Sequence, residues 1–262
     1  MDTWNPGQYE KFQHEREQPF VDLLALIQAA PAMRVIDLGC GTGKLTRRLH
    51  QTLAARETVG VDRSERMLEA AERDPHQDGL RFELGTVESF SADDEYDLIF
   101  SNAVFHWIED HEGLVARLIR ALRPGGQLAF QMPAMHRHPS HVVADALASV
   151  APFGRALNGW HRPQPVLEPE DYARLLFRAG IANPKVRVVI YPHVLASRDD
   201  VVEWMKGTLL TEYEKHFRPE VFEEFLAAYR QRLVAQLEDA RPFFFPFRRI
   251  LVWGQRSDPR SG

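Results

Sequence analysis

The chain has 262 residues, of which 44% are hydrophobic and 26% are charged, and its formal net charge at pH 7 is −5. This length is enough for one large α/β core, and the mildly acidic balance gives no electrostatic reason to expect a nucleic acid or an anionic membrane as partner. The single cysteine excludes an intrachain disulfide and a cysteine-rich metal cluster, and it favours a reducing compartment.

The N-terminal stretch contains no apolar segment of the signal-peptide type, and no apolar run approaches the roughly 20 residues that span a bilayer. The sequence therefore predicts a cytoplasmic protein with no membrane partner. Its oligomeric state is predicted to be a monomer or a weak homodimer.

Residues 1–30 precede the first predicted strand and are expected to form a helical segment that acts as a lid. Four of their side chains are spaced for one helix face: Tyr9, Phe12, Arg16 and Phe20. Because proline lacks an amide hydrogen and its ring collides with the preceding turn, Pro19 is predicted to break this helix.

Short β-rich runs alternate with amphipathic helical stretches over residues 33–133, which is typical of a parallel sheet wound with helices. The predicted strands are MRVID, ETVGVD, LRFELG, EYDLIFSN and QLAFQMP. Between them, three stretches have helical spacing: GKLTRRLHQTL, SERMLEAAER, which Ser64 caps, and HEGLVARLIRAL. The RPGG stretch is predicted to separate the last helix from the fifth strand.

Residues 134–242 contain one clear strand, KVRVVIY, with helical stretches on both sides. The longest helical stretches are SRDDVVEWMKGTLL and PEVFEEFLAAYRQRLVAQLE. We interpret this range as a mainly helical lid with one core strand, followed by a final strand over residues 243–256. The whole chain, 1–262, is therefore predicted to be a single α/β domain.

The stretch VIDLGCGTG places Gly39, Gly41 and Gly43 directly after a buried strand, where bare backbone can approach a ligand closely. Nicotinamide-dinucleotide enzymes use the spacing G-x-G-x-x-G at such a turn, whereas this chain has G-x-G-x-G. Asp37 at the strand end would repel a pyrophosphate but suits a cationic ammonium group. Asp62 ends the next strand, where a carboxylate reaches ribose hydroxyls in either class of cofactor.

Four motifs in chain order resemble the class I S-adenosylmethionine-dependent methyltransferases: VIDLGCGTG, VGVDRS, YDLIFSNAVFHW and LRPGGQLAF. The resemblance implies a Rossmann-like sheet of seven strands with the last strand antiparallel, and S-adenosylmethionine as the cofactor of the 33–133 core. The residues that it implies for cofactor binding are Asp37, Gly39, Cys40, Gly41, Asp62, Arg63, Met67, Thr86, Val87, Glu88, Ser101 and Asn102, with Tyr9, Phe12 and Arg16 from the N-terminal segment. Thr86 stands where many relatives carry Asp, so either its hydroxyl or the Val87 amide is expected to contact the adenine.

The two ends of the chain are similar to the trans-aconitate 2-methyltransferase family. The similarity begins with DTWNPGQYEKFQHEREQPFVDLL and continues through LIFSNAVFHWIEDHEGL, LAFQMP, DVVEWMKGTLL, FLAAYRQRLVAQ and PFRRILVWG, so it covers nearly the whole chain. It implies an enzyme that esterifies a carboxylate of a small polycarboxylic acid, with trans-aconitate or a relative as the acceptor.

Methyl transfer from a sulfonium to a carboxylate needs alignment rather than a general base, because the acceptor is already ionised at neutral pH. Arginine and other polar donors are expected around a tricarboxylate. We predict that His106 and Trp107 lie beside the methyl donor as the catalytic residues. The predicted acceptor-binding residues are Gln131, Trp160, His161, Arg162, Tyr191, Arg248 and Arg249, and strand alternation turns at most one of the last two inward.

Three alternative functions remain open. GTLLTEYEKHF has no arginine where the family carries one, and ARPFFFPFRR adds aromatic residues, which favours a carbon, nitrogen or hydroxyl acceptor with His106 as a general base. Glycine spacing and Asp37 disfavour a nicotinamide-dependent oxidoreductase, and the complete lid disfavours a non-catalytic S-adenosylmethionine-binding protein. HRHPSH suggests a metal site, but methyl transfer needs none and no acidic partner is nearby in the sequence, so no metal is predicted.

Overall fold

The computed structural model describes residues 13–258, and for residues 13–16 it describes the backbone alone. The chain divides into two compact units. The first comprises Met1–Pro133, Pro165–Val189 and Arg249–Gly262, and the second comprises Ala134–Gln164 and Ile190–Arg248. Over the described part of the chain, no helix combines the length and the apolar character needed to cross a membrane.

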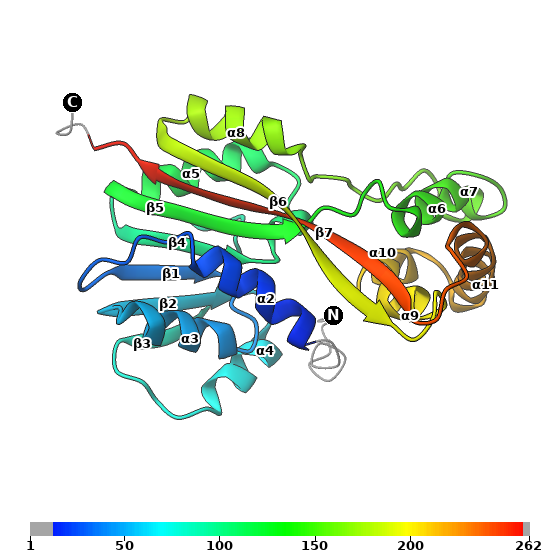
Figure 1. The fold of residues 1–262 in the computed structure, drawn as a ribbon, viewed down its shortest axis with the longest axis horizontal. Helices are drawn as coiled ribbons and strands as arrows, with labels where there is room; N and C mark the ends of the chain where they lie inside the picture. Colours follow the sequence, from blue (N-terminus) through cyan, green and yellow to red (C-terminus); the bar gives the residue numbers. More distant parts are fainter. Residues whose placement is uncertain (1–12, 259–262) are drawn as a thin grey trace. The chain divides into compact units, whose positions relative to one another are not determined.

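A seven-stranded sheet forms the centre of the fold, with the strand order β3-β2-β1-β4-β5-β7-β6 (Figure 1). The strands are β1 (Arg34–Leu38), β2 (Glu57–Asp62), β3 (Leu80–Leu84), β4 (Tyr96–Asn102), β5 (Leu122–Pro133), β6 (Ile181–Leu195) and β7 (Phe243–Arg256). Strands β1 to β5 pair in parallel, and β7 pairs antiparallel with β5. The predicted seven-stranded α/β sheet with an antiparallel last strand is thereby confirmed.

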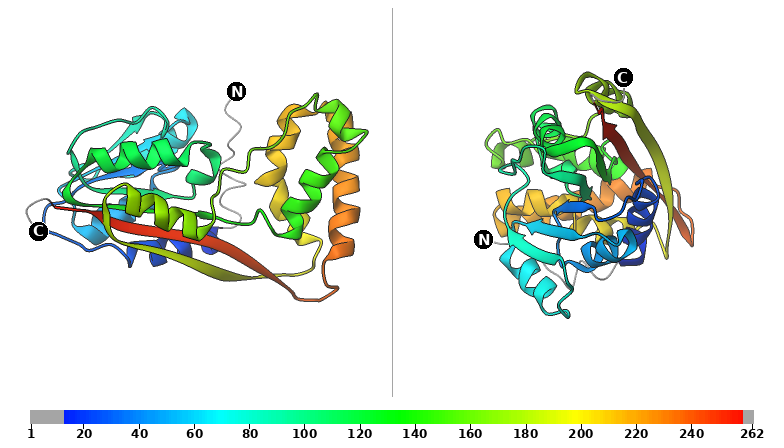
Figure 2. Two further views of the ribbon diagram at one scale, coloured as in Figure 1. Left: turned by 90° about the horizontal axis from the view of Figure 1, so that it is seen from above. Right: turned by 90° about the vertical axis from the view of Figure 1, so that its left-hand side faces the viewer.

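Helices of the first unit cover both faces of the sheet (Figure 2). They are α2 (Gln13–Leu24), α3 (Lys44–Leu53), α4 (Glu65–Glu72), α5 (His111–Ala121) and α8 (Pro169–Arg178). Helices α2 and α3 bury Phe20 and Leu49 on the face that carries Phe100 and Ala129. The neighbouring Phe130 points to the opposite face, where its ring packs edge-on against Tyr172 of α8. Period-two alternation along β5 thus supplies both layers of the core.

Helix α2 continues through Pro19, so the predicted break at this proline is wrong. The proline removes one backbone hydrogen bond and strains the preceding turn. Burial outweighs this cost, because Phe20 and Leu23 are both fully buried and the Phe20 ring lies 5.6 Å from that of Phe100. The residue pattern within the helix does not reveal this stabilisation, because it comes from packing against the sheet.

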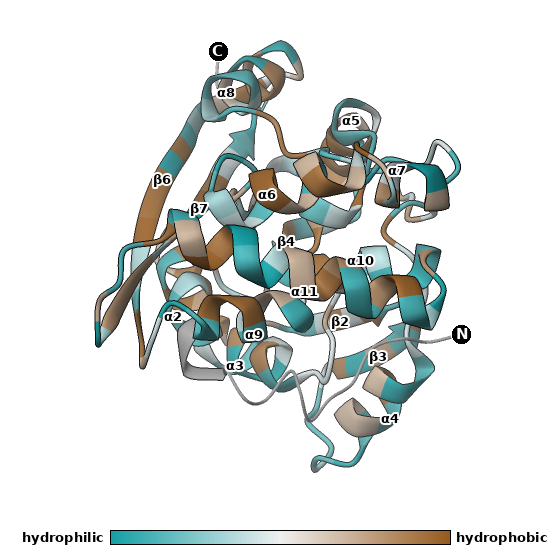
Figure 3. Cartoon of the chain, turned by 90° about the vertical axis from the view of Figure 1, so that its right-hand side faces the viewer, coloured by the Kyte–Doolittle hydropathy of each residue, from teal (hydrophilic) through white to brown (hydrophobic). Residues whose placement is uncertain are grey.

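Two strands are longer than the sequence pattern predicts. Strand β5 already begins at Leu122 and includes the RPGG stretch, with an irregularity in its pairing between Tyr96 and Leu98 of β4. Strand β6, at the edge of the sheet, extends beyond KVRVVIY in both directions and exposes Val188 and Val194. Figure 3 colours parts of β6 brown, the colour of hydrophobic residues.

The second unit is mainly helical. Its helices are α6 (Pro139–Ala148), α7 (Phe153–Ala156), α9 (Asp200–Lys206), α10 (Leu209–His216) and α11 (Pro219–Gln236). Helices α6 and α11 pack together, and the buried Tyr229 hydroxyl donates a 2.9 Å hydrogen bond to the Ser140 carbonyl. Phe153 and Phe225 form an edge-to-face pair in the same core. Segment 165–189, with α8 and the first part of β6, lies in the first unit.

Candidate functional site

The glycine loop between β1 and α3 takes a conformation that requires glycine. Gly39 has φ +81°, and a Cβ at this position would lie 2.2 Å from Cγ2 of Val104. Gly41 also has a positive φ, +55°, but a Cβ there would meet no protein atom within 4 Å. The loop is therefore packed against the β4 side at Gly39 and open at Gly41.

Asp62, the last residue of β2, holds two backbone segments in place. Its Oδ2 accepts a hydrogen bond from the Gly41 amide at 2.8 Å, and its Oδ1 accepts one from the Ser64 amide at 2.9 Å. The Ser64 hydroxyl in turn accepts from the Met67 amide and caps α4, as predicted. One carboxylate thus connects the glycine loop to the start of the next helix.

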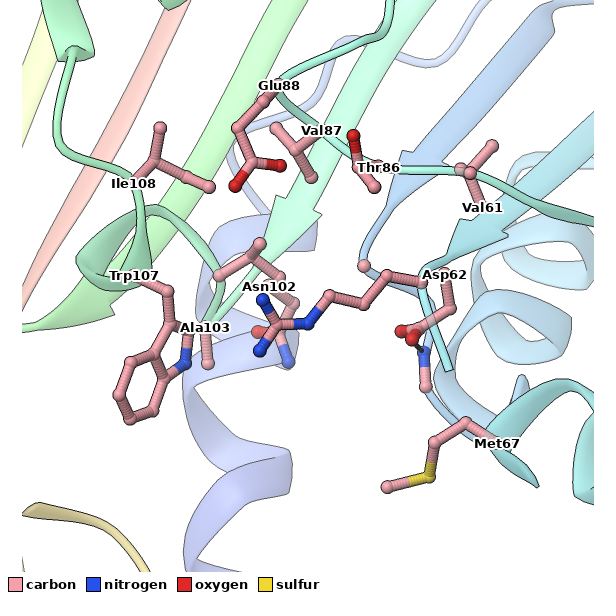
Figure 4. Close-up of a pocket in the computed structure, with 15 residues that line it drawn as sticks. Val61, Asp62, Met67, Thr86, Val87, Glu88, Asn102, Ala103, Trp107 and Ile108 are labelled. Atoms are coloured by element: carbon pink, nitrogen blue, oxygen red, sulfur yellow. Dashed lines mark hydrogen bonds between the residues drawn. The ribbon is translucent and has the colours of Figure 1, made fainter. Parts of the chain in front are cut away.

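A pocket opens at the carboxyl ends of β1, β2, β3 and β4 (Figure 4). It encloses about 710 Å³ of space, part of which is open solvent. Its lining residues are Gly39, Gly41, Val61, Asp62, Arg63, Met67, Gly85, Thr86, Val87, Glu88, Asn102, Ala103, Val104, Trp107 and Ile108. Ligands of open α/β sheets bind at this edge.

Most of the predicted cofactor-binding residues line this pocket together. From the glycine loop to η1 (Phe105–Trp107), they are Gly39, Gly41, Asp62, Arg63, Met67, Thr86, Val87, Glu88, Asn102 and the predicted catalytic Trp107. The apolar part of the wall, formed by Val61, Val104 and Ile108, was not predicted from the sequence. These residues stand beside the motif residues, but their apolar character is equally typical of a core.

The Thr86 hydroxyl is engaged within its own loop. It donates to the Ser89 Oγ at 2.9 Å and accepts from the Ser89 amide at 3.1 Å. Of the two alternatives for the adenine contact, this geometry favours the backbone amide of Val87, a buried residue in the pocket wall.

Three predicted cofactor residues lie behind the pocket wall rather than in it. The Asp37 side chain is buried, and its Oδ2 accepts a 2.6 Å hydrogen bond from the Thr46 hydroxyl. Its Oδ1 accepts no hydrogen bond from the described residues. Burial raises the pKa of Cys40, and the buried Ser101 hydroxyl donates to the Leu38 carbonyl. Cys40 and Ser101 support the loop from beneath.

Burial raises the pKa of Asp37 to about 7, although the hydrogen bond from Thr46 opposes this shift and the Asp62 carboxylate adds to it. Near neutral pH the group is therefore poised between its acid and its carboxylate. A cationic ligand nearby would favour the charged form.

A chain of polar side chains leads from the pocket into the sheet. The side-chain oxygen of Asn102, at the pocket wall, accepts a 2.6 Å hydrogen bond from Nε2 of Gln131. The Gln131 Oε1 in turn accepts one from Arg249 Nη1 at 3.0 Å. Gln131 and Arg249 are both buried, on β5 and β7 respectively. Of the two adjacent arginines Arg248 and Arg249 on β7, Arg249 is buried, while Arg248 is partly exposed.

The second catalytic candidate, His106, lies on the same η1 turn as Trp107, with the two ring centroids 4.6 Å apart. Only Trp107 of this pair contributes to the pocket wall. Tyr9 and Phe12 fall outside the described residues, as does the side chain of Arg16.

The remaining predicted acceptor residues belong to the second unit. Arg162 forms a two-pronged ion pair with Asp145, with N–O distances of 3.0 and 2.9 Å. Trp160 stacks on His216 at 3.8 Å, Tyr191 is buried, and His161 is exposed. Phe245 and Phe247 from the aromatic stretch pack with Trp204 and His193 in the core of this unit.

The histidine-rich stretch HRHPSH has a structural use in the second unit. The His138 ring accepts a hydrogen bond from the Ser140 amide and caps α6. Among the described side chains, residues 17–258, no cluster of three or more His, Cys, Asp or Glu residues has the arrangement of a metal site.

Replacing Gly41 by alanine is expected to weaken ligand binding in the pocket about tenfold, equivalent to about 1.4 kcal/mol, because the methyl group extends into open space at its wall. The positive φ costs about 1 kcal/mol of unfolding free energy for a non-glycine residue. Gly159→Ala is the matched control, since Gly159 has φ +83°, no neighbour within 4 Å and no place in the pocket. Calorimetric titration with S-adenosylhomocysteine, alongside urea unfolding, distinguishes the two effects. Equal affinities for the two variants would contradict the prediction.

Comparison with known proteins places these features in context. Residues 29–171 match the model of a family described as a methyltransferase domain. The chain is 39% identical to the trans-aconitate 2-methyltransferase of Deinococcus radiodurans, over 98% of this chain and 99% of the relative. It is 37% identical to the protein of the same name from Variovorax paradoxus, over 89% and 90% of the two chains.

Solved structures share the fold at lower sequence identity. The YcgJ protein of Bacillus subtilis superimposes with a TM-score of 0.63 at 18% identity, covering 92% of this chain and 99% of the other. Phosphoethanolamine N-methyltransferase 2 of Haemonchus contortus, solved with S-adenosyl-L-methionine, gives a TM-score of 0.55 at 16% identity, covering 92% of this chain and 52% of the other.

Proposed function

The chain belongs to the methyltransferases and, among them, to the trans-aconitate 2-methyltransferase family, and on this premise we propose that it transfers a methyl group from S-adenosylmethionine to a carboxylate of trans-aconitate. Full-length similarity to relatives of that name is the observation that carries the proposal. The product is a monomethyl ester of a small polycarboxylic acid.

The residues of the pocket fit S-adenosylmethionine. A Cβ on Gly41 would point into open space, so the bare backbone forms a cradle for a ligand part that lies against the loop. Asp62 provides carboxylate lone pairs for ribose hydroxyls, and the Val87 amide is available to the adenine edge. Met67 and the apolar wall formed by Val61 and Ile108 offer packing surface to the base.

When bound, S-adenosylmethionine supplies an electrophilic methyl group on a sulfonium centre. The protein's task is to align the acceptor oxygen with that group and to exclude competing water. Trp107 and Asn102 line the pocket beside the glycine loop and are proposed to form the wall nearest the reaction. No general base is needed for an ionised carboxylate, so His106, which does not line the pocket, is given no part in proton transfer.

The series of hydrogen bonds from Arg249 through Gln131 to Asn102 supports the attraction of a polyanionic acceptor to the Asn102 side of the pocket. A guanidinium buried beside an amide pair is a strong electrostatic partner for a carboxylate, because the surrounding dielectric is low. The aromatic stretch that suggested an apolar acceptor packs into the core of the second unit at Phe245 and Phe247. That packing favours the carboxylate over the apolar alternative.

A screen of acceptors with methyl-labelled S-adenosylmethionine tests the proposal. The acids trans-aconitate, cis-aconitate and citrate are compared with a phenol and a primary amine. We expect label in trans-aconitate, released by mild alkali as methanol, because esters hydrolyse whereas N-methyl and C-methyl products do not. Absence of turnover with every polycarboxylate, combined with turnover of the phenol or amine, would replace the proposed acceptor class.

Replacing Arg249 by glutamine is expected to raise the KM for trans-aconitate about tenfold, because a buried cation is lost from the hydrogen-bonded chain that ends at Asn102 in the pocket wall. The Kd of S-adenosylhomocysteine should change less than twofold, since Arg249 does not line the pocket. The matched control is Arg248→Gln, which removes the same charge from a partly exposed position on the same strand. A KM that rises equally in both variants would show that total charge, not the buried arginine, attracts the acid.

A further inference from the structure

A buried histidine–tyrosine pair lies directly behind the η1 turn that carries Trp107. His111, the first residue of α5, is 2% exposed, and Tyr172 of α8 is fully buried. The His111 Nε2 lies 2.7 Å from the Phe105 carbonyl oxygen, and its Nδ1 lies 2.6 Å from the Tyr172 hydroxyl. The pair therefore connects α8, through α5, to the backbone of η1.

The direction of each hydrogen bond in this chain follows from its partners. A carbonyl oxygen can only accept, so Nε2 of His111 carries the hydrogen that bonds Phe105. Burial lowers the pKa of His111 and keeps the ring neutral, so Nδ1 accepts from the Tyr172 hydroxyl. The Tyr172 oxygen then accepts from the Leu167 amide at 3.3 Å. The Met132 sulfur also lies 3.4 Å from the Tyr172 oxygen, but it is a weaker acceptor than a neutral ring nitrogen, so the hydroxyl hydrogen is directed to Nδ1.

The Phe105 carbonyl oxygen accepts two hydrogen bonds that fix the η1 turn. It accepts the Ile108 amide at 2.9 Å, which closes the turn, and it also accepts His111, which fixes the turn to α5. The Phe105 ring stacks on Phe130 at 4.0 Å, and Phe130 packs edge-on against Tyr172. Asp110 caps α5 through the Gly113 amide, so His111 is anchored on a fixed helix start.

The position of η1 matters to the pocket because its neighbours form the wall. Ala103, Val104, Trp107 and Ile108 all line the pocket, and Val104 also packs against Gly39 of the glycine loop. A rotation of the turn about Phe105 would displace Trp107 while the contacts of Asp62 stay intact. A displacement of this kind lowers the rate of methyl transfer more than it lowers the affinity for the ligand.

We propose that His111 and Tyr172 are positioning residues for methyl transfer, which hold η1 so that Trp107 keeps its place in the pocket wall. The inference rests on the proposed function, because the effect is on alignment for that reaction. Neither residue lines the pocket, so both act through Phe105.

Two substitutions of His111 separate its two hydrogen bonds. The amide nitrogen of His111→Gln reaches about as far as Nε2 and can still donate to Phe105, whereas His111→Asn is shorter and retains only the contact with Tyr172. We expect kcat with trans-aconitate to fall about tenfold in His111→Asn and to stay within about threefold of the parent in His111→Gln. The Kd of S-adenosylhomocysteine should stay within about threefold in both. Equal losses of kcat in the two variants, or a loss of affinity that matches the loss of kcat, would overturn the proposal.

Fluorine NMR of protein labelled with 5-fluorotryptophan tests the same inference without turnover. The chain has five tryptophans, and Trp107→Phe assigns one resonance to Trp107. In His111→Asn and in Tyr172→Phe we expect this resonance to shift or broaden while the other four stay in place. Tyr229→Phe, which removes a buried tyrosine hydroxyl in the second unit, is the control and should leave the Trp107 resonance unchanged.

An unchanged Trp107 resonance in the variants of both His111 and Tyr172 would overturn the positioning role, whatever the acceptor is. If the parent protein methylates no polycarboxylate but the resonance still responds, the proposed acceptor fails and the positioning role of the pair stands. Tyr172→Phe keeps the ring that packs on Phe130, so it remains a test if His111→Asn does not fold.

Discussion

Replacing Asp62 by alanine is expected to weaken S-adenosylhomocysteine binding roughly 10- to 100-fold, which corresponds to about 1–3 kcal/mol. Two effects combine in this loss. The carboxylate no longer accepts hydrogen bonds from ribose hydroxyls, and the Gly41 and Ser64 amides lose the acceptor that fixes the loop and the start of α4. Because the pocket is open at Gly41, a loop that is no longer held can move into the ligand space.

Calorimetric titration of the folded variant measures this effect directly. Glu65→Ala is the matched control, because it removes a neighbouring exposed carboxylate that does not line the pocket. It should leave the Kd within about twofold of the parent value. An unchanged Kd in Asp62→Ala would remove Asp62 from the binding site, and an equal loss in Glu65→Ala would assign the effect to net charge.

The pocket was predictable from the sequence because its residues come from local motifs. A parallel sheet brings the carboxyl ends of its strands to one edge, so residues that follow separate strands meet there without further information. The glycine loop and the Thr86–Glu88 stretch follow β1 and β3, and Asp62 and Asn102 are the last residues of β2 and β4. The same logic fails for Val104 and Ile108, whose apolar side chains fit a core as well as a pocket wall.

Contacts between distant segments were not predictable from residue patterns. Nothing in the sequence pairs Arg162 with Asp145, so the ion pair of the second unit could not be distinguished from an acceptor contact. The interior position of Pro19 in α2 depends on burial against Phe100, which a helix pattern does not contain. The link from Tyr172 to His111 spans two helices that are far apart in the chain, and neither residue belongs to a glycine-loop or strand-end motif.

Asp37 could be recognised as an acid at the end of a strand, but not as a group with a perturbed titration. Its pKa depends on complete burial, on the Thr46 hydroxyl from α3 and on the Asp62 carboxylate from β2. These partners come together only in the folded chain, so the shift has a thermodynamic consequence for folding.

Stability of the ligand-free protein is expected to fall between about pH 4 and pH 7 because of Asp37 alone. The native state, with a pKa of about 7, retains a proton that the unfolded state releases near pH 4, so the unfolded state binds fewer protons in this window and the free energy of unfolding decreases as the pH rises. A shift of about three pKa units corresponds to an effect of about 4 kcal/mol, reached above pH 7. Below about pH 4 both states are protonated and the contribution is fully stabilising.

Urea unfolding of the parent and of Asp37→Asn from pH 4 to pH 8 measures this contribution as a difference. The near-isosteric amide cannot ionise, so the stability of the variant relative to the parent should rise by up to about 4 kcal/mol across the window. Thr46→Val removes the hydroxyl that lowers the pKa of Asp37, so its stability should continue to fall at higher pH than that of the parent. Saturating S-adenosylhomocysteine should flatten the fall in the parent, because a cationic ammonium group favours the carboxylate. A difference between parent and Asp37→Asn that is constant from pH 4 to pH 8 would show that the Asp37 carboxylate is not perturbed by its burial.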